Sequence, residues 1–195
     1  MMGLSHPNPR IASQYEPEGI FLSAPLAGDF LLLQGWGEHP EFHGRVSYNG
    51  VQLKGHPGLD FAADPGAEIF AVDAGRVVEI NIDLGGFGRH IKLEHTWGES
   101  FYAQLGDVLV ESGQRIERGQ LITRTERQRT PYAPHLHFGI RIAPFNRFDG
   151  WGGFCDPLPY LYATEILLPT EAGADEIAEA VLPPISSEHS KMRRP

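Results

Sequence analysis

Two histidines separated by a single residue, His135 and His137, offer the clearest potential for chemistry in this sequence. Side chains on an extended strand alternate between its faces, so both imidazoles are expected on one face, about 6–7 Å apart at their backbones. Far upstream, His56 and Asp60 flank a Pro-Gly pair, which disfavours a helix and predicts a turn entering a strand. Imidazole nitrogens and a carboxylate oxygen suit zinc, and three such ligands leave one coordination position open.

A purely structural explanation of the same histidines is equally open. A histidine pair in a strand can belong to a packed core or to a groove surface. The chain also contains nine histidines in 195 residues, so some clustering is expected by chance. Spacing alone supports a metal site and a structural role to the same degree.

Composition limits the classes of protein to which the chain can belong. With 195 residues, 41% of them apolar, it can bury one core and carry appended segments. A net charge of −9 gives no electrostatic basis for binding nucleic acid. No apolar run reaches 18 residues, so no membrane span is predicted. Cys155 is the only cysteine, which excludes an internal disulfide and disfavours a cysteine-based zinc site.

The apolar pattern predicts an all-β, antiparallel fold of short strands separated by glycine turns. Asn49-Gly50 between two short β-prone stretches predicts a hairpin. We expect three parts: an irregular N-terminal arm over residues 1–24, the main domain over 25–168, and a partly disordered tail over 169–195. The polar residues 1–18 lack the apolar stretch of a secretory signal, so the sequence indicates no export route.

Several segments, taken in order, resemble the lysostaphin/LytM-type zinc metalloendopeptidases, which cut peptide bonds in bacterial peptidoglycan. The resemblance covers roughly residues 34–142. Its pieces are Gly55-His56-Pro57-Gly58-Leu59-Asp60-Phe61, Gly66 to Val77, Gly86-Phe87-Gly88, Tyr102-Ala103 and Pro134-His135-Leu136-His137-Phe138. The resemblance implies a barrel-sandwich-like core of antiparallel sheets with an open groove.

The same resemblance implies roles for individual residues. The zinc ligands would be His56, Asp60 and His137, and His135 would be a neighbouring catalytic histidine that does not bind the metal. The sequence itself does not show which of the two paired histidines is the ligand. Tyr102 and His95 are expected to line the substrate groove, and the expected substrate is a peptidoglycan peptide.

One position departs from the family pattern. Where the family usually reads Tyr-x-His-Leu, this chain has Gln104 in place of the second catalytic histidine. A glutamine amide can donate a hydrogen bond to an oxyanion but does not titrate. Loss of one such donor costs about 2.7–4 kcal/mol in other hydrolases, so a slowed enzyme is expected. His90 and His95 are nearby in the sequence and are the possible substitutes.

Three other functions compete with an active endopeptidase. The first is an inactive zinc-binding relative that binds cell wall or regulates a cell-wall hydrolase. The second is a metal-dependent hydrolase of another substrate, or a zinc-buffering protein, because the fold does not choose the substrate. The third is a biotinyl or lipoyl carrier, suggested by the hairpin pattern of residues 108–122. A carrier needs a lysine on a tight turn with particular neighbours, and neither Lys54 nor Lys92 has them.

Overall fold

The structure is a computed structural model that describes residues 19–28, 30–45, 47–83, 86–127, 134–162 and 166–167. Within this part of the chain, nearly every regular element is a β-strand, which confirms the predicted all-β class. The helices are the single turn α1 (Pro40–His43) and the 3-10 turn η1 (Leu158–Tyr160). No helix in the described ranges has the length and apolar character needed to cross a membrane.

Two sheets pack face to face. The larger sheet has the spatial strand order β11 (Arg115–Ile116), β7 (Gly75–Asp83), β8 (Gly88–His95), β9 (Gly98–Ala103), β13 (His135–Ile142), β5 (Leu59–Ala62), β2 (Phe30–Gln34), β15 (Ile166–Leu167). The smaller sheet has the order β10 (Leu105–Val108), β12 (Leu121–Thr125), β6 (Glu68–Phe70). Except for the parallel β2–β15 pair, all of these neighbouring strands are antiparallel.

The side chains of β13 point alternately to the two faces of the large sheet. Leu136, Phe138 and Ile140 are fully buried in the main apolar core, which also includes Ile69 and Ile122 from the small sheet. The intervening residues of β13, which include both histidines, therefore lie on the opposite face. The main core thus fills the space between the sheets, and the histidines face away from it.

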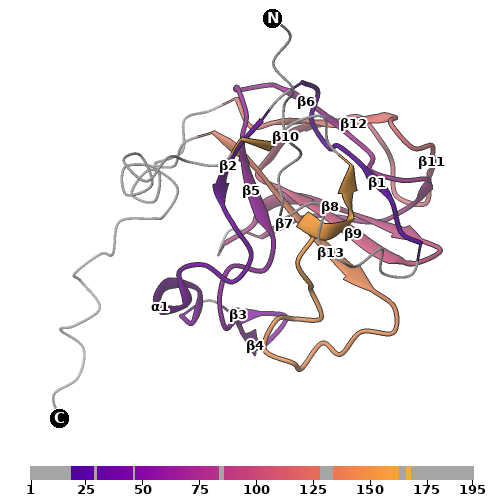
Figure 1. Cartoon of the computed structure of the whole chain (residues 1–195). Coiled ribbons are helices and arrows are strands. Elements are labelled where there is room, and N and C mark those ends of the chain that lie inside the picture. Colours follow the sequence, from indigo (N-terminus) through magenta and orange to yellow (C-terminus); the bar gives the residue numbers. More distant parts are fainter. Residues whose placement is uncertain are drawn as a thin grey trace, which may run out of the picture.

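A second, aromatic cluster covers the face on which the histidines lie. It contains Tyr48, Phe87, Phe101 and Phe154, together with Leu53 and Ala103. The hairpin of β3 (Ser47–Tyr48) and β4 (Val51–Gln52) contributes to this cover and turns at Asn49 and Gly50, both with positive φ, as the sequence predicted. Figure 1 shows α1 and this hairpin together at one end of the molecule, beside the long segment that follows β13.

The main core begins earlier in the chain than the predicted start of the domain at residue 25. Leu22 is fully buried, and β1 (Leu22–Ser23) pairs in parallel with β14 (Leu161–Tyr162). The end of the expected N-terminal arm is therefore part of the folded body. The expected tail, residues 169–195, lies outside the described residues.

Candidate metal centre

Three side chains from two strands and a turn converge on one point. His56 Nε2 lies 3.1 Å from Asp60 Oδ1, and His137 Nδ1 lies 2.8 Å from the same oxygen. The two imidazole nitrogens are 3.0 Å apart. All three side chains are at least 94% buried. Ligands at zinc's usual 2.0–2.1 Å, arranged tetrahedrally, lie about 3.3 Å from one another, so this triangle has nearly the size of one face of a zinc site.

Strand register places two of these groups, and a tight turn places the third. Asp60 of β5 is the direct cross-strand partner of His137 of β13, so their side chains share a face at close range. His56 precedes β5 by a turn in which Gly58 passes very close to β13. A Cβ at Gly58 would lie 2.5 Å from the Phe138 carbonyl oxygen and 3.0 Å from His137 Cε1. Only glycine fits this approach without displacing the histidine.

Hydrogen bonding orients His56 for binding a cation. Its Nδ1 lies 3.0 Å from the Gly35 carbonyl oxygen, and because a carbonyl only accepts, Nδ1 carries the proton. The Nε2 lone pair of His56 then faces a second acceptor, Asp60 Oδ1. Two acceptors at this distance repel each other unless a proton or a metal ion lies between them. The donor set and its geometry therefore fit a metal ion.

The electrostatics of the cluster favour an ionised Asp60 and a neutral His137. Burial by itself raises the pKa of Asp60, but the charges of His56 and His135 and the hydrogen bonds of His137 and His56 outweigh it. The pKa of Asp60 consequently lies well below its usual value. Burial lowers the pKa of His137. An ionised carboxylate beside imidazoles with available lone pairs is the state in which such residues bind a divalent cation.

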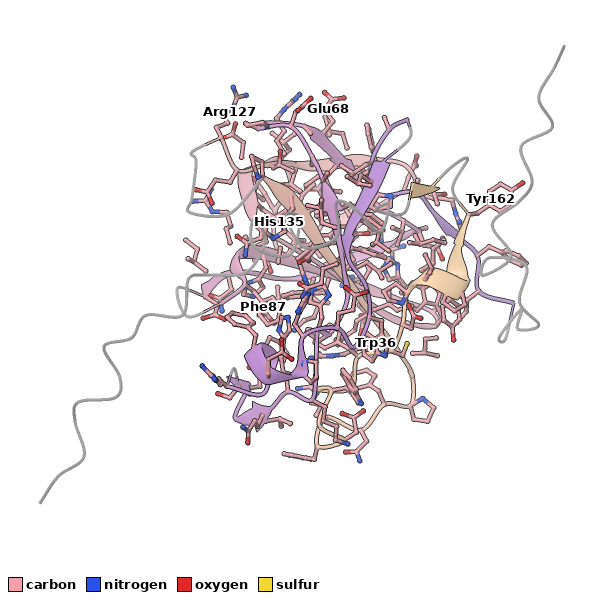
Figure 2. The ribbon with its side chains drawn as sticks, turned by 60° about the vertical axis from the view of Figure 1, so that its left-hand side comes forward. Trp36, Glu68, Phe87, Arg127, His135 and Tyr162 are labelled. Carbon is pink, nitrogen blue, oxygen red and sulfur yellow. The ribbon has the colours of Figure 1, made fainter. Side chains whose placement is uncertain are left out.

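His135 lies next to the cluster but outside it. It pairs with Ala62 across β5–β13, two cross-strand pairs beyond Asp60 and His137, so its side chain shares their face. The side chain is buried, and its charge acts on Asp60. Figure 2 shows His135 on the far side of Phe87 from α1. The structure thus distinguishes the paired histidines that the sequence left equivalent: His137 is in the triangle and His135 is beside it.

Comparison with known proteins agrees with this arrangement. The family model described as peptidase family M23 matches residues 54–148, which include all four of these side chains. This part of the chain is a peptidase family M23 domain. It is 30% identical over 114 residues to the glycyl-glycine endopeptidase ALE-1 of Staphylococcus capitis, covering 57% of this chain and 30% of that protein. It is 31% identical over 88 residues to the peptidoglycan DD-endopeptidase ShyB of Vibrio cholerae, covering 45% and 20%.

A solved structure extends the comparison to the fold. The catalytic domain of lysostaphin from Staphylococcus simulans superimposes with a TM-score of 0.50 at 27% identity, covering 65% of this chain and 88% of that domain. The first curated relatives are much longer than this chain, which spans between about a fifth and two fifths of their length. The similarity therefore concerns the M23 domain and not those proteins as wholes.

Gln104 of this M23 domain bonds to the backbone of Gly86. Its backbone is left-handed, with φ 63°, and its side-chain Nε2 donates to the Gly86 carbonyl oxygen at 3.2 Å. The neighbouring Ala103 is the cross-strand partner of His137, so Gln104 follows immediately after the strand that borders the site. The amide donor expected to face an oxyanion is instead turned toward the turn that begins at Gly86.

Two residues expected in the substrate groove are buried in the M23 core, so that expectation is wrong. Tyr102 is fully buried, and its hydroxyl accepts a hydrogen bond from the Val72 N–H at 2.9 Å. His95 bonds through Nε2 to Ser100 Oγ at 2.7 Å, and Ser100 in turn contacts the Tyr102 hydroxyl. Tyr102 pairs with Phe138, whose side chain is in the main core. The strand register therefore places both side chains on the face opposite His137.

His90 shares a face with His137 but is not available as a substitute histidine. Its Nδ1 bonds to the Gly88 carbonyl oxygen and its Nε2 to Glu79 Oε1, both at 3.1 Å. The Phe101 ring contacts both histidines, with centroid distances of 5.0 Å to His90 and 6.0 Å to His137. Phe101 thus separates His90 from the candidate metal centre.

One histidine of this region is not predicted by the motifs of the sequence. His43, at the end of α1, packs its ring against His56 with centroids 5.0 Å apart. Its Nε2 also lies 3.3 Å from Nε2 of Gln34. No spacing rule connects His43 to His56, since the intervening hairpin determines where α1 lies. The only available signal was an additional histidine in the polar segment before the His-Pro-Gly turn.

Proposed function

We propose that the protein is a zinc-dependent endopeptidase that hydrolyses peptide bonds of bacterial peptidoglycan. The observation that carries the proposal is the convergence of His56 Nε2, Asp60 Oδ1 and His137 Nδ1 within 3.1 Å of one another in a family M23 domain. The endopeptidase relatives named above, one of them described as acting on peptidoglycan, support the choice of substrate class.

The three converging side chains would hold the metal, and the remaining residues would manage the proton. A bound zinc ion supplies Lewis acidity toward a peptide carbonyl and makes a water molecule more acidic. His135 is the proposed proton carrier: it accepts a proton from the attacking water and delivers it to the amine nitrogen that leaves. The hydroxyl adds to the carbonyl carbon, the C–N bond breaks, and the products are a carboxylic acid and an amine, between which the last proton passes to give a carboxylate and an ammonium.

A second function is favoured by one specific observation. Gln104 stands where the family resemblance implies a titratable histidine, and its amide donates to the Gly86 carbonyl oxygen. An inactive zinc-binding relative, which binds cell wall or regulates a cell-wall hydrolase, is therefore the alternative. It predicts zinc binding and retention on peptidoglycan without hydrolysis.

Zinc content and amine release, measured together, separate these functions. About one zinc per chain is expected in the wild type, and little or none in His137→Ala. Purified peptidoglycan incubated with the wild type should gain free amino groups, and with His135→Ala it should gain few. His39→Asn is a matched control, because His39 is a histidine outside the triangle and asparagine tolerates its left-handed backbone. Zinc without amine release would support the alternative, and absence of zinc would contradict both.

A further inference from the structure

A fourth imidazole lies against the candidate metal centre, on an element that precedes the His-Pro-Gly turn. The His43 ring is tilted 37° to the His56 ring at a centroid distance of 5.0 Å. Its hydrogen-bond partner Gln34 is the cross-strand partner of Asp60 in the β2–β5 pair. His43 therefore contacts His56 directly and is connected to the strand of Asp60 through Gln34.

The backbone around α1 fixes this imidazole in place. The His43 N–H donates to the His39 carbonyl at 3.0 Å, and the Gly44 N–H donates to the Pro40 carbonyl at 2.8 Å. The Gln52 amide, on the β3–β4 hairpin, also donates to the Gly44 carbonyl. A Cβ at Gly44 would lie 2.7 Å from the Pro40 carbonyl oxygen, so this tight turn depends on glycine. His43 is consequently presented by a closed, hydrogen-bonded turn.

Its hydrogen bond also fixes where the proton of His43 lies. An amide nitrogen only donates, so Gln34 Nε2 donates and His43 Nε2 accepts. The proton of the neutral imidazole is then on Nδ1. His43 is only partly buried, whereas the three side chains of the triangle are almost completely buried. His43, a neutral N–H donor, is thus more exposed than the three side chains that it adjoins.

We propose that His43 is a further active-site residue, whose neutral Nδ1–H donates a hydrogen bond to the carbonyl oxygen of the scissile peptide. This role rests on the proposed function. His43 would supply from α1 the donor that the family resemblance implies at position 104. Gln104 does not fill that role in this structure, because its amide donates to Gly86. A donor to a developing oxyanion is typically worth 10²–10³-fold in kcat.

Steady-state kinetics and zinc content of His43→Ala test this role. The variant is expected to retain about one zinc per chain and to lose about 10²–10³-fold in kcat on dye-labelled peptidoglycan, with a smaller change in KM. His43→Gln, which keeps an N–H donor, should retain more activity than His43→Ala. If the kcat of His43→Ala lies within about threefold of the wild-type kcat, the loss is far smaller than expected and the proposal is overturned. Loss of zinc from His43→Ala would also overturn the proposal, because it would mean that His43 acts by holding His56 in place.

Two readouts that do not depend on turnover complete the test. In the zinc-loaded wild type, the ¹⁵N signals of the His43 ring should identify a neutral Nδ1–H tautomer at pH 7, and an Nε2–H tautomer would contradict the role. Acetohydroxamate, whose oxyanion imitates the reacting carbonyl, should bind the cobalt-substituted His43→Ala protein more weakly than cobalt-substituted wild type, as read from the visible spectrum.

If zinc-loaded wild type releases no amine, the proposed function fails and this role fails with it. If wild type is active and His43→Ala equals it, only the role of His43 fails.

Discussion

Asp60 and His137 face each other across the antiparallel β5–β13 pair, with His137 Nδ1 2.8 Å from Asp60 Oδ1. A slip of one residue in this register would turn every side chain of one strand to its other face. Such a slip would remove the apolar residues of β13 from the main core and would also remove His137 from the candidate metal centre. The burial that determines the fold therefore also determines the site.

Loss of the Asp60 charge should remove most of the metal affinity. Asp60→Asn keeps the size of the side chain but replaces a carboxylate with a neutral amide. Because loss of even an outer partner of a metal ligand costs 10–100-fold, we expect zinc affinity to fall by more than about 100-fold. Competition with a chromophoric chelator measures this change, with His39→Asn as the control that should bind like the wild type.

Metal removal should also lower stability. Zinc at 100 times its Kd stabilises the folded state by about 2.7 kcal/mol. A chelator should therefore lower the Tm of the wild type by several degrees and leave the Tm of Asp60→Asn nearly unchanged. An equal effect on both proteins would show that the stabilising ion binds elsewhere.

Gly58→Ala should damage stability and metal binding together. The new methyl group would lie 2.5 Å from the Phe138 carbonyl oxygen and 3.0 Å from His137 Cε1, so β13 or the turn must move. Overpacking of this kind costs about 1–3 kcal/mol. Gly113→Ala is the control: its Cβ would meet nothing within 4 Å, so any loss there reflects only its φ of 84°. Urea denaturation and zinc content measure both effects, and unchanged zinc affinity in Gly58→Ala would contradict the inferred link to His137.

Gln104→His should raise activity if the wild type is an enzyme. Histidine is among the residues that tolerate the left-handed backbone found here, with φ 63°. An imidazole that leaves Gly86 and turns toward the site would add a donor, and we expect kcat on labelled peptidoglycan to rise by about 10²-fold, the lower end of what one donor supplies. Gln104→Asn keeps an amide on a shorter side chain and should give no gain. An unchanged rate in Gln104→His would mean that the position is not part of the reaction in this chain.

His95 should influence stability and not catalysis. Burial lowers its pKa, so the folded state binds fewer protons than the unfolded state below pH 6.5. Stability conferred by the neutral ring is complete above pH 6.5 and is lost as the pH falls below it. His95→Gln should flatten this dependence by up to about 1.4 kcal/mol per pH unit, the limit for one proton.

Chemical denaturation at several pH values measures the effect of His95 on stability. A range of about pH 5 to 8 is suitable because it brackets histidine's ordinary pKa of about 6.5. The kcat and KM of His95→Gln on peptidoglycan should match those of the wild type, because the side chain lies on the face opposite His137. A selective change in KM would restore His95 to the substrate groove.

The sequence by itself determined the elements that local rules control. Alternation along β13 follows from the two-residue period of a strand, and the Asn49-Gly50 turn follows from the positive φ that these residues tolerate. The same alternation makes His135 and His137 equivalent. Only pairing with β5, which places Asp60 opposite His137, distinguishes them.

Tertiary structure decided which face each residue occupies and which distant elements meet. Tyr102 and His95 follow family motifs in the sequence, but pairing of their strands places them on the core face. His43 has no periodic relation to His56, and the fold of the intervening hairpin brings their rings within 5.0 Å. Local preferences act over a few residues, whereas strand register and loop packing depend on contacts between segments far apart in the chain.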